Sequence, residues 1–321
     1  MDSLTQMTLG AVIGAAVMGK KYGRKSTLVG AICGTIPDLD VFLNMGDPVS
    51  DMTYHRGFSH SILFAVLVTP LFAWLFSRWS WLGVNVKDKR LHLGVFLALV
   101  THPLLDAVTI YGTQLLWPLP TEPIGIGSIF IIDPLYTLPL LGFLIGYLVI
   151  KSQKLLYAGL LVSTLYLGWT VIIQNQVHDM AETQIDSQKI LVQPTPFNSI
   201  LWRILVMENQ GYKVGYYSLF DNSKTIVFKE FAADPKLLPE NWAVNRLKWF
   251  TKGFFGVRQE GDNIIMSDLR MGLEPNDYVF QFIVDVEPNQ RYEQPRSMSR
   301  MKFIIKRAFR DASWNKPVQG D

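Results

Sequence analysis

The chain has 321 residues, of which 49% are apolar and only 18% charged, and its mean hydropathy is +0.19. Soluble globular proteins carry about 25% charged residues, so this composition excludes a disordered chain, a coiled coil and an ordinary cytosolic enzyme. The net charge of +3 is too small to argue for nucleic acid as a partner. The single cysteine, Cys33, excludes a disulfide framework and any CxxC zinc or redox motif.

Charged residues are distributed unevenly along the chain. Residues 176–321 contain 19 Lys/Arg and 18 Asp/Glu, which leaves only 11 and 9 for residues 1–175. The sequence therefore predicts a transmembrane domain at 1–175 and a soluble, extracytoplasmic domain at 176–321.

Apolar runs of about 20 residues, the length that spans a ~30 Å hydrocarbon layer, define the first domain. Strong runs lie at 58–76, 91–110, 128–150 and 155–175, and weaker ones, rich in Gly and Ala, at 4–19 and 26–43. Small residues let membrane helices approach closely, so we count the weaker runs too, the second as a half-helix ending at Pro37. We therefore expect a membrane all-α domain of about six transmembrane helices.

The loops between these runs predict the orientation. Ten of the eleven Lys and Arg residues of the first domain follow the first, third and fifth runs, and only Arg56 lies on the other side. Short cytoplasmic loops are enriched in Lys and Arg, so we expect the N-terminus and everything after residue 175 outside the cytoplasm. For a bacterial inner-membrane protein, this places the C-terminal domain in the periplasm.

Six potential metal ligands gather at the outer ends of three runs. They come in pairs, Asp38 with Asp40, His55 with His60, and His102 with Asp106. Ionisable groups inside a membrane cost a few kcal/mol each and are functional by default. Imidazole with carboxylate and no thiolate suits Zn, with Mn or Fe as alternatives. One or two divalent ions are expected, because two ions bridged by an aspartate would use all six ligands.

The spacing supports a shared site. His102 and Asp106 are four residues apart, so a helix presents both on one face. Asp133, near the outer end of the fifth run, and His178, at the start of the soluble domain, are further candidates. His92 opens the fourth run roughly 15 Å along the helix from the ligands and is expected not to bind metal.

Each pair also has a purely structural interpretation. An Asp-x-Asp sequence after a proline often ends a helix, and an isolated His-x-x-x-Asp pair is a weak signal. Arg56 beside Asp51 can be an interfacial ion pair.

Several motifs carry these residues: 2–6 at the start of the chain, 34–40 (GTIPDLD), 55–61 (HRGFSHS) and 101–106 (THPLLD). Together they resemble the membrane-bound metal-dependent hydrolases of the YdjM-like family, over most of residues 1–175. Stretches at 194–198 and 268–273 resemble its longer members. The resemblance implies a hydrolase distantly related to zinc-dependent phospholipase C and nuclease P1, which cut phosphoesters on a zinc cluster.

From about residue 190 the pattern changes to short β-like runs. We expect them at 200–207, 212–219, 225–231, 254–258, 264–267 and 278–286, with a hairpin turn at 208–211. Helices are expected around 242–251 and 298–310, so this is a small α+β or β-rich domain. Asp268 and Arg270 could face the membrane site and hold an anionic substrate, with a structural ion pair as the alternative.

The leading interpretation is a membrane-bound hydrolase that cleaves a phosphoester, a lipid or lipid-linked phosphate, at the outer membrane face. The metal would lower the pKa of a bound water toward 7 and stabilise charge on the phosphoryl oxygens. Arg56 is the candidate for stabilising the anionic transition state, and Asp38 and His60 are the other catalytic candidates. Ser59 and Ser61 are expected to form supporting hydrogen bonds.

Two alternatives belong to other classes. A metal-ion transporter or metal-sensing protein would need polar residues continuing through the membrane, whereas mostly Leu, Val, Phe and Ala lie below the ligands. A scaffold with a structural metal would leave no open coordination position.

Overall fold

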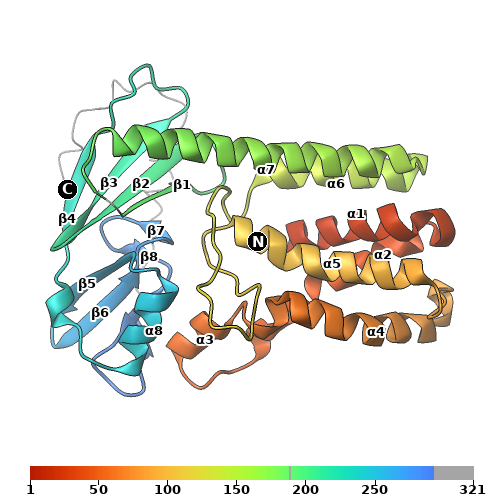
Figure 1. The fold of residues 1–321 in the computed structure, drawn as a ribbon, viewed down its shortest axis with the longest axis horizontal. Helices are drawn as coiled ribbons and strands as arrows, with labels where there is room; N and C mark the ends of the chain where they lie inside the picture. The colour runs from red at the N-terminus through yellow and green to blue at the C-terminus, as the bar shows by residue number, and fades with distance from the viewer. Residues whose placement is uncertain (188, 293–321) are drawn as a thin grey trace. The chain divides into compact units, whose positions relative to one another are not determined.

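The computed structural model describes residues 1–187 and 189–292, which divide into two compact units. The first, the membrane unit, comprises Met1–Met45, Thr53–Ile126 and Ile131–Trp169. The second, the β-rich unit, comprises Gly46–Met52, Gly127–Phe130 and the chain from Thr170 onward. In Figure 1 the helices α1, α2, α4, α5 and α6 belong to the membrane unit and the strands to the β-rich unit.

The membrane unit is organised around the hairpin of α1 (Ser3–Tyr22) and α2 (Lys25–Thr35). Small residues make the contact, Gly10 and Gly14 of α1 with Gly30 and Gly34 of α2. A Cβ atom added at Gly30 would lie 2.1 Å from the carbonyl oxygen of Gly10, so the two backbones touch directly. This confirms the close helix approach predicted from the Gly- and Ala-rich runs.

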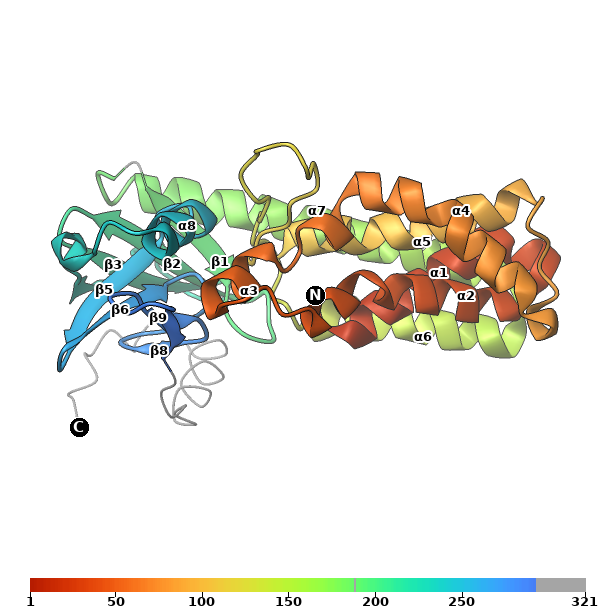
Figure 2. The ribbon, with the colours of Figure 1, turned by 90° about the horizontal axis from the view of Figure 1, so that it is seen from below.

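Longer helices complete this unit: α4 (Ile62–Arg78), α5 (Lys89–Val108), α6 (Pro134–Ile150) and, up to Trp169, α7 (Gln153–Glu182). α5 packs against α1, α2 and α4, and α6 packs against α1. Figures 1 and 2 show these helices running side by side. Short helices η1 (Pro37–Phe42), α3 (Pro48–Tyr54) and η2 (Phe58–His60) lie between α2 and α4, and η3 (Ser80–Leu82) follows α4.

Two described helices, α5 and α7, are long and apolar enough to cross a membrane. A third span results if the segment Pro48–His60 and α4, bent by 58° against each other, count as one. The predicted six spans are therefore not supported. α2 has only 11 residues, α6 has 17, and α1 carries buried polar side chains that lower its hydropathy. α2 does end before Pro37, as the half-helix prediction required.

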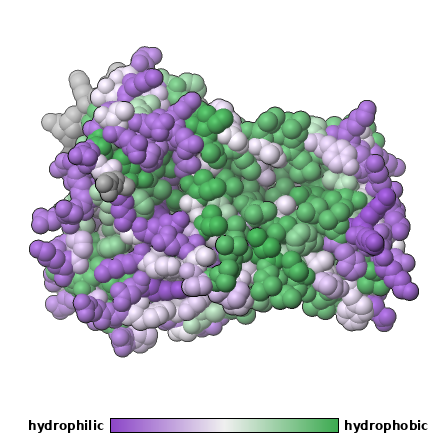
Figure 3. Space-filling model, in the orientation of Figure 1, coloured by the Kyte–Doolittle hydropathy of each residue, from purple (hydrophilic) through white to green (hydrophobic). Residues whose placement is uncertain are grey.

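The surface of the membrane unit is apolar over its helices. The face shown in Figure 3 is hydrophobic along them and hydrophilic at the end that carries the α1–α2 and α4–α5 loops. That end holds the basic residues on which the orientation was predicted, and Lys21 Nζ lies 2.8 Å from Asp88 Oδ2 there. This ion pair ties the start of α5 to the end of α1.

The β-rich unit contains two antiparallel four-stranded sheets and one two-stranded sheet. The first sheet has the order β1 (Ile190–Pro194), β2 (Leu201–Glu208), β3 (Gly211–Ser218), β4 (Phe228–Ala232). The second has the order β10 (Gln290–Arg291), β9 (Gln281–Ile283), β6 (Asn263–Asp268), β5 (Phe255–Glu260). β7 (Gly272–Leu273) pairs with β8 (Asp277–Tyr278), and α8 (Trp242–Phe250) precedes β5.

The prediction of a small β-rich domain is confirmed, together with its helix at 242–251 and its turn at 208–211. Glu208 pairs with Gly211 across that turn in the β2–β3 hairpin. β1 was not predicted, because its five residues follow directly on polar positions and show no alternation. Within the predicted run 278–286, Tyr278 belongs to β8 and Gln281–Ile283 form the short β9. The helix expected at 298–310 lies outside the described residues.

A buried ion pair joins the first sheet to the turn after β7. Arg203 of β2 donates from Nε to Glu274 Oε1 at 2.9 Å and from Nη1 to the carbonyl of Leu269 at 2.9 Å. Burial alone would lower the pKa of Arg203, but the adjacent Glu274 raises it above the ordinary arginine value. Tyr216 donates to the other oxygen of Glu274 at 2.9 Å, so both charges are fully hydrogen-bonded.

Candidate functional site

Four side chains of the membrane unit converge on one point. They are Asp38 of η1, His60 of η2, and His102 and Asp106 of α5. The Nε2 atoms of His60 and His102 lie 3.2 Å apart. Asp38 Oδ1 lies 3.4 Å and 3.3 Å from these two nitrogens, and Asp106 Oδ2 lies 3.3 Å and 3.4 Å from them.

The hydrogen bonds of both imidazoles fix where their protons lie. His102 Nδ1 is 2.6 Å from the carbonyl oxygen of Gly34, which can only accept, so Nδ1 carries the proton. His60 Nδ1 is 2.9 Å from Ser59 Oγ and 3.4 Å from Asp40 Oδ2, which favours a proton on Nδ1 there too. In the neutral rings, both Nε2 lone pairs therefore face the centre of the group.

The two carboxylate oxygens of Asp106 also differ in their contacts. Its Oδ1 accepts from Gln6 Nε2 at 3.1 Å, pairs with Arg56 Nη2 at 3.2 Å and contacts the amino group of Met1. Its Oδ2 is buried and has no hydrogen-bond partner within the described part of the chain. Thus Oδ1 of Asp106 already accepts from several donors, whereas Oδ2 faces the centre of the group.

Four electron-rich atoms at these separations match a small cation. Five of the six separations are 3.2–3.4 Å, and all four atoms lie within 4.8 Å of one another. For comparison, a regular tetrahedron with edges near 3.3 Å has its centre about 2.0 Å from each corner, which is the Zn–N and Zn–O bond length. The group thus fits one divalent ion. The side chain of Asp38 is 22% exposed and the other three are fully buried, so the group is accessible from the Asp38 side.

The other two predicted ligands, Asp40 and His55, lie beside this group and pair with each other. His55 Nδ1 is 2.7 Å from Asp40 Oδ1. Asp40 Oδ2 accepts from Ser59 Oγ at 2.5 Å and from the backbone N–H of Arg56 at 3.2 Å. A carboxylate that orients a histidine through its second nitrogen is the common outer partner of a metal ligand, and Asp40 stands in that relation to His60.

Arg56 lies buried against the group. Its Nη1 donates to Thr109 Oγ1 at 3.3 Å, its guanidinium carbon lies 4.8 Å from the ring centre of Tyr111, and its Nε has no acceptor among the described residues. The backbone of Arg56 has φ 62°, a left-handed conformation that costs a non-glycine residue about 1–2 kcal/mol. Such strain persists where the surroundings over-determine the conformation, often at functional sites.

The structure places the remaining candidates of the N-terminal half elsewhere. Asp133 caps α6, accepting from the backbone N–H groups of Leu135 and Tyr136 at 2.9 Å and 3.2 Å, and it accepts from Tyr166 at 2.8 Å. Ser61 caps α4. His92 lies near the start of α5, 3.2 Å from the Asp88 carbonyl, and is not part of the four-residue group.

The candidates of the β-rich unit are not in the group either. His178 lies on α7 next to two exposed acidic residues, Asp179 and Glu182. Asp268 and Arg270 are buried and form a closed pair, with Nη2 to Oδ2 at 2.6 Å and Nε to Oδ1 at 2.9 Å. This arrangement matches the structural ion pair given above as the alternative to a role in holding an anionic substrate.

Sequence reasoning missed Gln6 and the carbonyl of Gly34. Gln6 is buried, donates to both the His102 carbonyl and Asp106 at 3.1 Å, and keeps an Oε1 without a partner among the described residues. A glutamine inside an apolar run was the available signal. Gly34 was assigned only a packing role, because a backbone carbonyl leaves no mark in the sequence.

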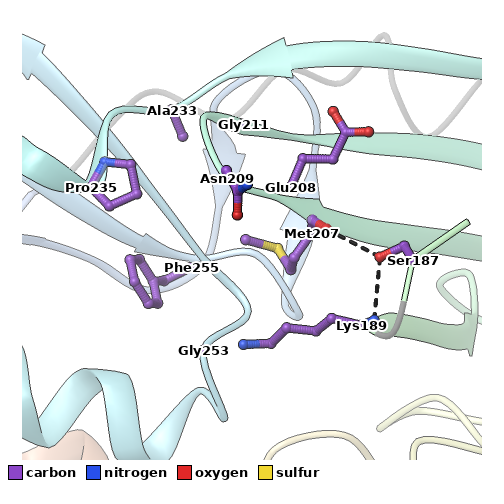
Figure 4. Close-up of a pocket in the computed structure, with 10 residues that line it drawn as sticks. All are labelled: Ser187, Lys189, Met207, Glu208, Asn209, Gly211, Ala233, Pro235, Gly253 and Phe255. Carbon is purple, nitrogen blue, oxygen red and sulfur yellow. Dashed lines mark hydrogen bonds between the residues drawn. The ribbon is translucent and has the colours of Figure 1, made fainter.

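The β-rich unit has a separate cavity of about 390 Å³, shown in Figure 4. Its walls include Met207, Pro235 and Phe255, and Lys189 reaches across it toward Gly253. Partial burial lowers the pKa of Lys189. The lining also includes Ser187 and Glu208 and contains no histidine or cysteine.

Comparisons with known proteins agree with the membrane part of this description. Residues 1–177, more than half of the chain, match the family model described as YdjM inner membrane protein. The YfhP protein of Bacillus subtilis (strain 168), described as uncharacterized, is 25% identical over 232 residues, 67% of this chain and 68% of that protein. The inner membrane protein YbcI of Escherichia coli (strain K12) is 31% identical over 118 residues, 36% and 66% of the two chains.

No solved structure matches the chain. The distant relation to zinc-dependent phospholipase C and nuclease P1 that the resemblance implied is therefore not shown.

Proposed function

We propose that this chain, which belongs to the YdjM inner membrane protein family, is a membrane-bound, metal-dependent hydrolase that cleaves a phosphoester, a lipid or lipid-linked phosphate. The single observation that supports it most is the group of four electron-rich atoms, five of whose six separations are 3.2–3.4 Å. Two of these atoms are imidazole nitrogens whose protons lie on the far side of the ring. Buried acceptors facing one another repel unless a cation or a shared proton lies between them.

The ligand set is Asp38, His60, His102 and Asp106. Nitrogen and carboxylate oxygen without thiolate suit Zn, and also Mn or Fe, which accept two further ligands in an octahedral shell. A bound divalent ion would act as a Lewis acid on the phosphoryl group and acidify a water molecule. Since Asp38 is the exposed member, substrate and water would approach beside it.

The surrounding side chains have roles that follow from their hydrogen bonds. Asp40 and Ser59 hold the proton of His60 on Nδ1, and the Gly34 carbonyl does the same for His102. Arg56 keeps an Nε–H without an acceptor, which can donate to a phosphoryl oxygen as charge develops there.

The proposed hydrolysis needs no co-reactant other than water. Water adds to phosphorus, the P–O bond to the alcohol breaks, and the alcohol oxygen takes the proton that the water releases.

Packing below the site favours this reaction over transport. Between the ligands and the basic end of the unit lies a core of buried apolar side chains, including Val95, Ala98 and Leu99 of α5, Ala65 of α4 and Val29 of α2. Besides the sulfur atoms of Cys33 and Met18, the side chains of this core are hydrocarbon, and desolvating an ion there would cost several kcal/mol.

The proposed location is the bacterial inner membrane with the β-rich unit in the periplasm. The family model supports the membrane, and the basic residues at the α1–α2 and α4–α5 loops support this orientation. A substrate phosphate would then be cleaved at the outer face.

The test compares two histidines of the same helix. His102→Ala should remove most of the metal from the purified protein, while His92→Ala, at the opposite end of α5, should leave it unchanged. Arg56→Ala should keep near-normal metal content but reduce phosphoester turnover on the order of 10²-fold, as for loss of one preorganised donor. Equal metal content in both histidine variants would contradict the ligand set. Wild-type turnover in the Arg56 variant would remove Arg56 from the mechanism.

A further inference from the structure

The segment that carries Asp38 also carries an unusual run of exposed apolar side chains. These side chains are Leu39, Val41, Phe42 and Leu43, and we call them the apolar tip. All four are more than half exposed, and Phe42 is 81% exposed. Leaving large apolar side chains in water forfeits about 1.5–3 kcal/mol for each, so a contiguous run of this kind marks an interaction surface.

Helix lengths place the candidate ligands at one depth. Along α5 from Lys89, at 1.5 Å per residue, His102 lies about 20 Å and Asp106 about 26 Å away. Along α2 from Lys25, and then along η1 at about 2.0 Å per residue, Asp38 lies about 21 Å away. Both helices start at the end of the unit tied together by the Lys21–Asp88 pair.

The same count puts the apolar tip at the membrane boundary. Phe42 lies about 29 Å from Lys25, close to the ~30 Å thickness of a hydrocarbon core. The ligands therefore lie about 5–10 Å inside the far edge of the apolar layer, and the tip lies at that edge. The phosphate group of a bilayer lipid lies just outside this boundary. A water-soluble ester would have to enter apolar surroundings to reach the ligands.

The accessible side of the group points to the same route. Asp38 is its only partly exposed member, and Leu39 is the next residue in the chain. The exposed side of the group is therefore on the segment that carries the apolar tip. An amphiphile with its chains along the tip brings its phosphate to this exposed side without leaving the membrane.

We propose that the apolar tip inserts into the leaflet opposite the basic loops and that the substrate is a phosphoester of a bilayer lipid, which reaches the site sideways along the tip. The insertion stands on the exposure and depth of these residues alone. The choice of substrate rests on the proposed hydrolase function.

Insertion is tested without any assay of activity. The chain has one cysteine, Cys33, which is fully buried, so a cysteine added at the surface can be labelled selectively. A nitroxide on Phe42→Cys in phosphatidylcholine/phosphatidylglycerol vesicles should be reached by oxygen and protected from a water-soluble nickel chelate. The control is Phe220→Cys, an exposed aromatic position of the β-rich unit, where the chelate should reach the label. Equal access of the chelate to both labels would overturn the insertion.

The substrate is tested by a pair of esters. Phe42→Ser should lower hydrolysis of a phospholipid in vesicles at least 10-fold, while hydrolysis of a water-soluble aryl phosphate and metal content stay at wild-type levels. Equal loss on both esters, or loss on neither, would overturn the sideways route. If the wild-type protein cleaves neither ester, the proposals of a hydrolase and of a lipid substrate are both refuted. The nitroxide result then still decides whether the apolar tip inserts.

Discussion

A methyl group at Gly30 should weaken metal binding from a distance, through the contact between α1 and α2. In Gly30→Ala the new Cβ would lie 2.1 Å from the carbonyl oxygen of Gly10, about 1.3 Å short of the 3.4 Å at which ordinary contact begins. The carbonyl oxygen is a backbone atom and the new Cβ is bonded directly to the backbone, so no side-chain rotation can relieve the overlap. The helices must separate or shift by about this amount.

The displacement reaches the site because α2 also carries Gly34. The hydrogen bond from His102 Nδ1 to the Gly34 carbonyl is 2.6 Å long. Moving that carbonyl away by about 1.3 Å would stretch the bond to about 3.9 Å, beyond hydrogen-bonding range. Loss of an outer hydrogen bond to a metal-binding histidine typically costs 10–100-fold in metal affinity. We expect a decrease of that size.

The measurement is Zn²⁺ affinity of the purified protein, by competition with a chromogenic chelator. Gly142→Ala in α6 is the matched control, because a Cβ there meets nothing within 4 Å, and it should bind Zn²⁺ like the wild type. Helix content of both variants should be recorded alongside. Wild-type affinity in Gly30→Ala would refute the coupling between helix packing and the site, and equal losses in both variants would refute its specificity.

Three further predictions test other parts of the description. Glu274→Gln should lower the free energy of unfolding of the β-rich unit by about 3–5 kcal/mol, because it leaves the buried guanidinium of Arg203 without its counter-charge. The control, Glu260→Gln, removes the charge from a half-exposed pair and should cost less than about 1 kcal/mol in the same denaturant titration. Ser59→Ala should reduce Zn²⁺ affinity by about 10-fold in the chelator assay, since the hydroxyl links a ligand histidine to Asp40, and unchanged affinity would show that link to be dispensable. A periplasmic reporter fused after Gln176 should be active and one fused at Gly83 inactive, and the reverse pattern would invert the orientation.

The sequence indicated which residues come together better than how their side chains are arranged. Helical periodicity alone places His102 and Asp106 on one face, and their Nε2 and Oδ2 atoms are indeed 3.4 Å apart. It cannot show which member of Asp38/Asp40 points inward, because η1 is a tight 3-10 turn whose side chains are directed by their hydrogen bonds. The same holds for His55 and His60, which lie in and next to a short irregular turn.

The number of spans was overestimated for a related reason. Composition identifies apolar segments but does not show how they are broken. The run at 26–43 splits at Pro37 into α2 and η1, and the run at 128–150 yields a helix only from Pro134. Proline lacks the N–H that a continuing helix needs, so it is tolerated at the first turn and starts a new element at both positions.

The four candidate ligands come from two kinds of backbone, and this difference explains why Asp40 is expected to matter without being in the four-atom group. His102 and Asp106 are one turn apart on α5, so the helix itself fixes their separation. Asp38 and His60 lie on η1 and η2, turns too short to hold a side chain in place unaided. Asp40 joins these two turns, because its carboxylate is on η1 and accepts from Ser59 of η2 and from the backbone before it. Its hydrogen bonds hold the η1 and η2 turns, and with them Asp38 and His60, close to the two candidate ligands that α5 positions.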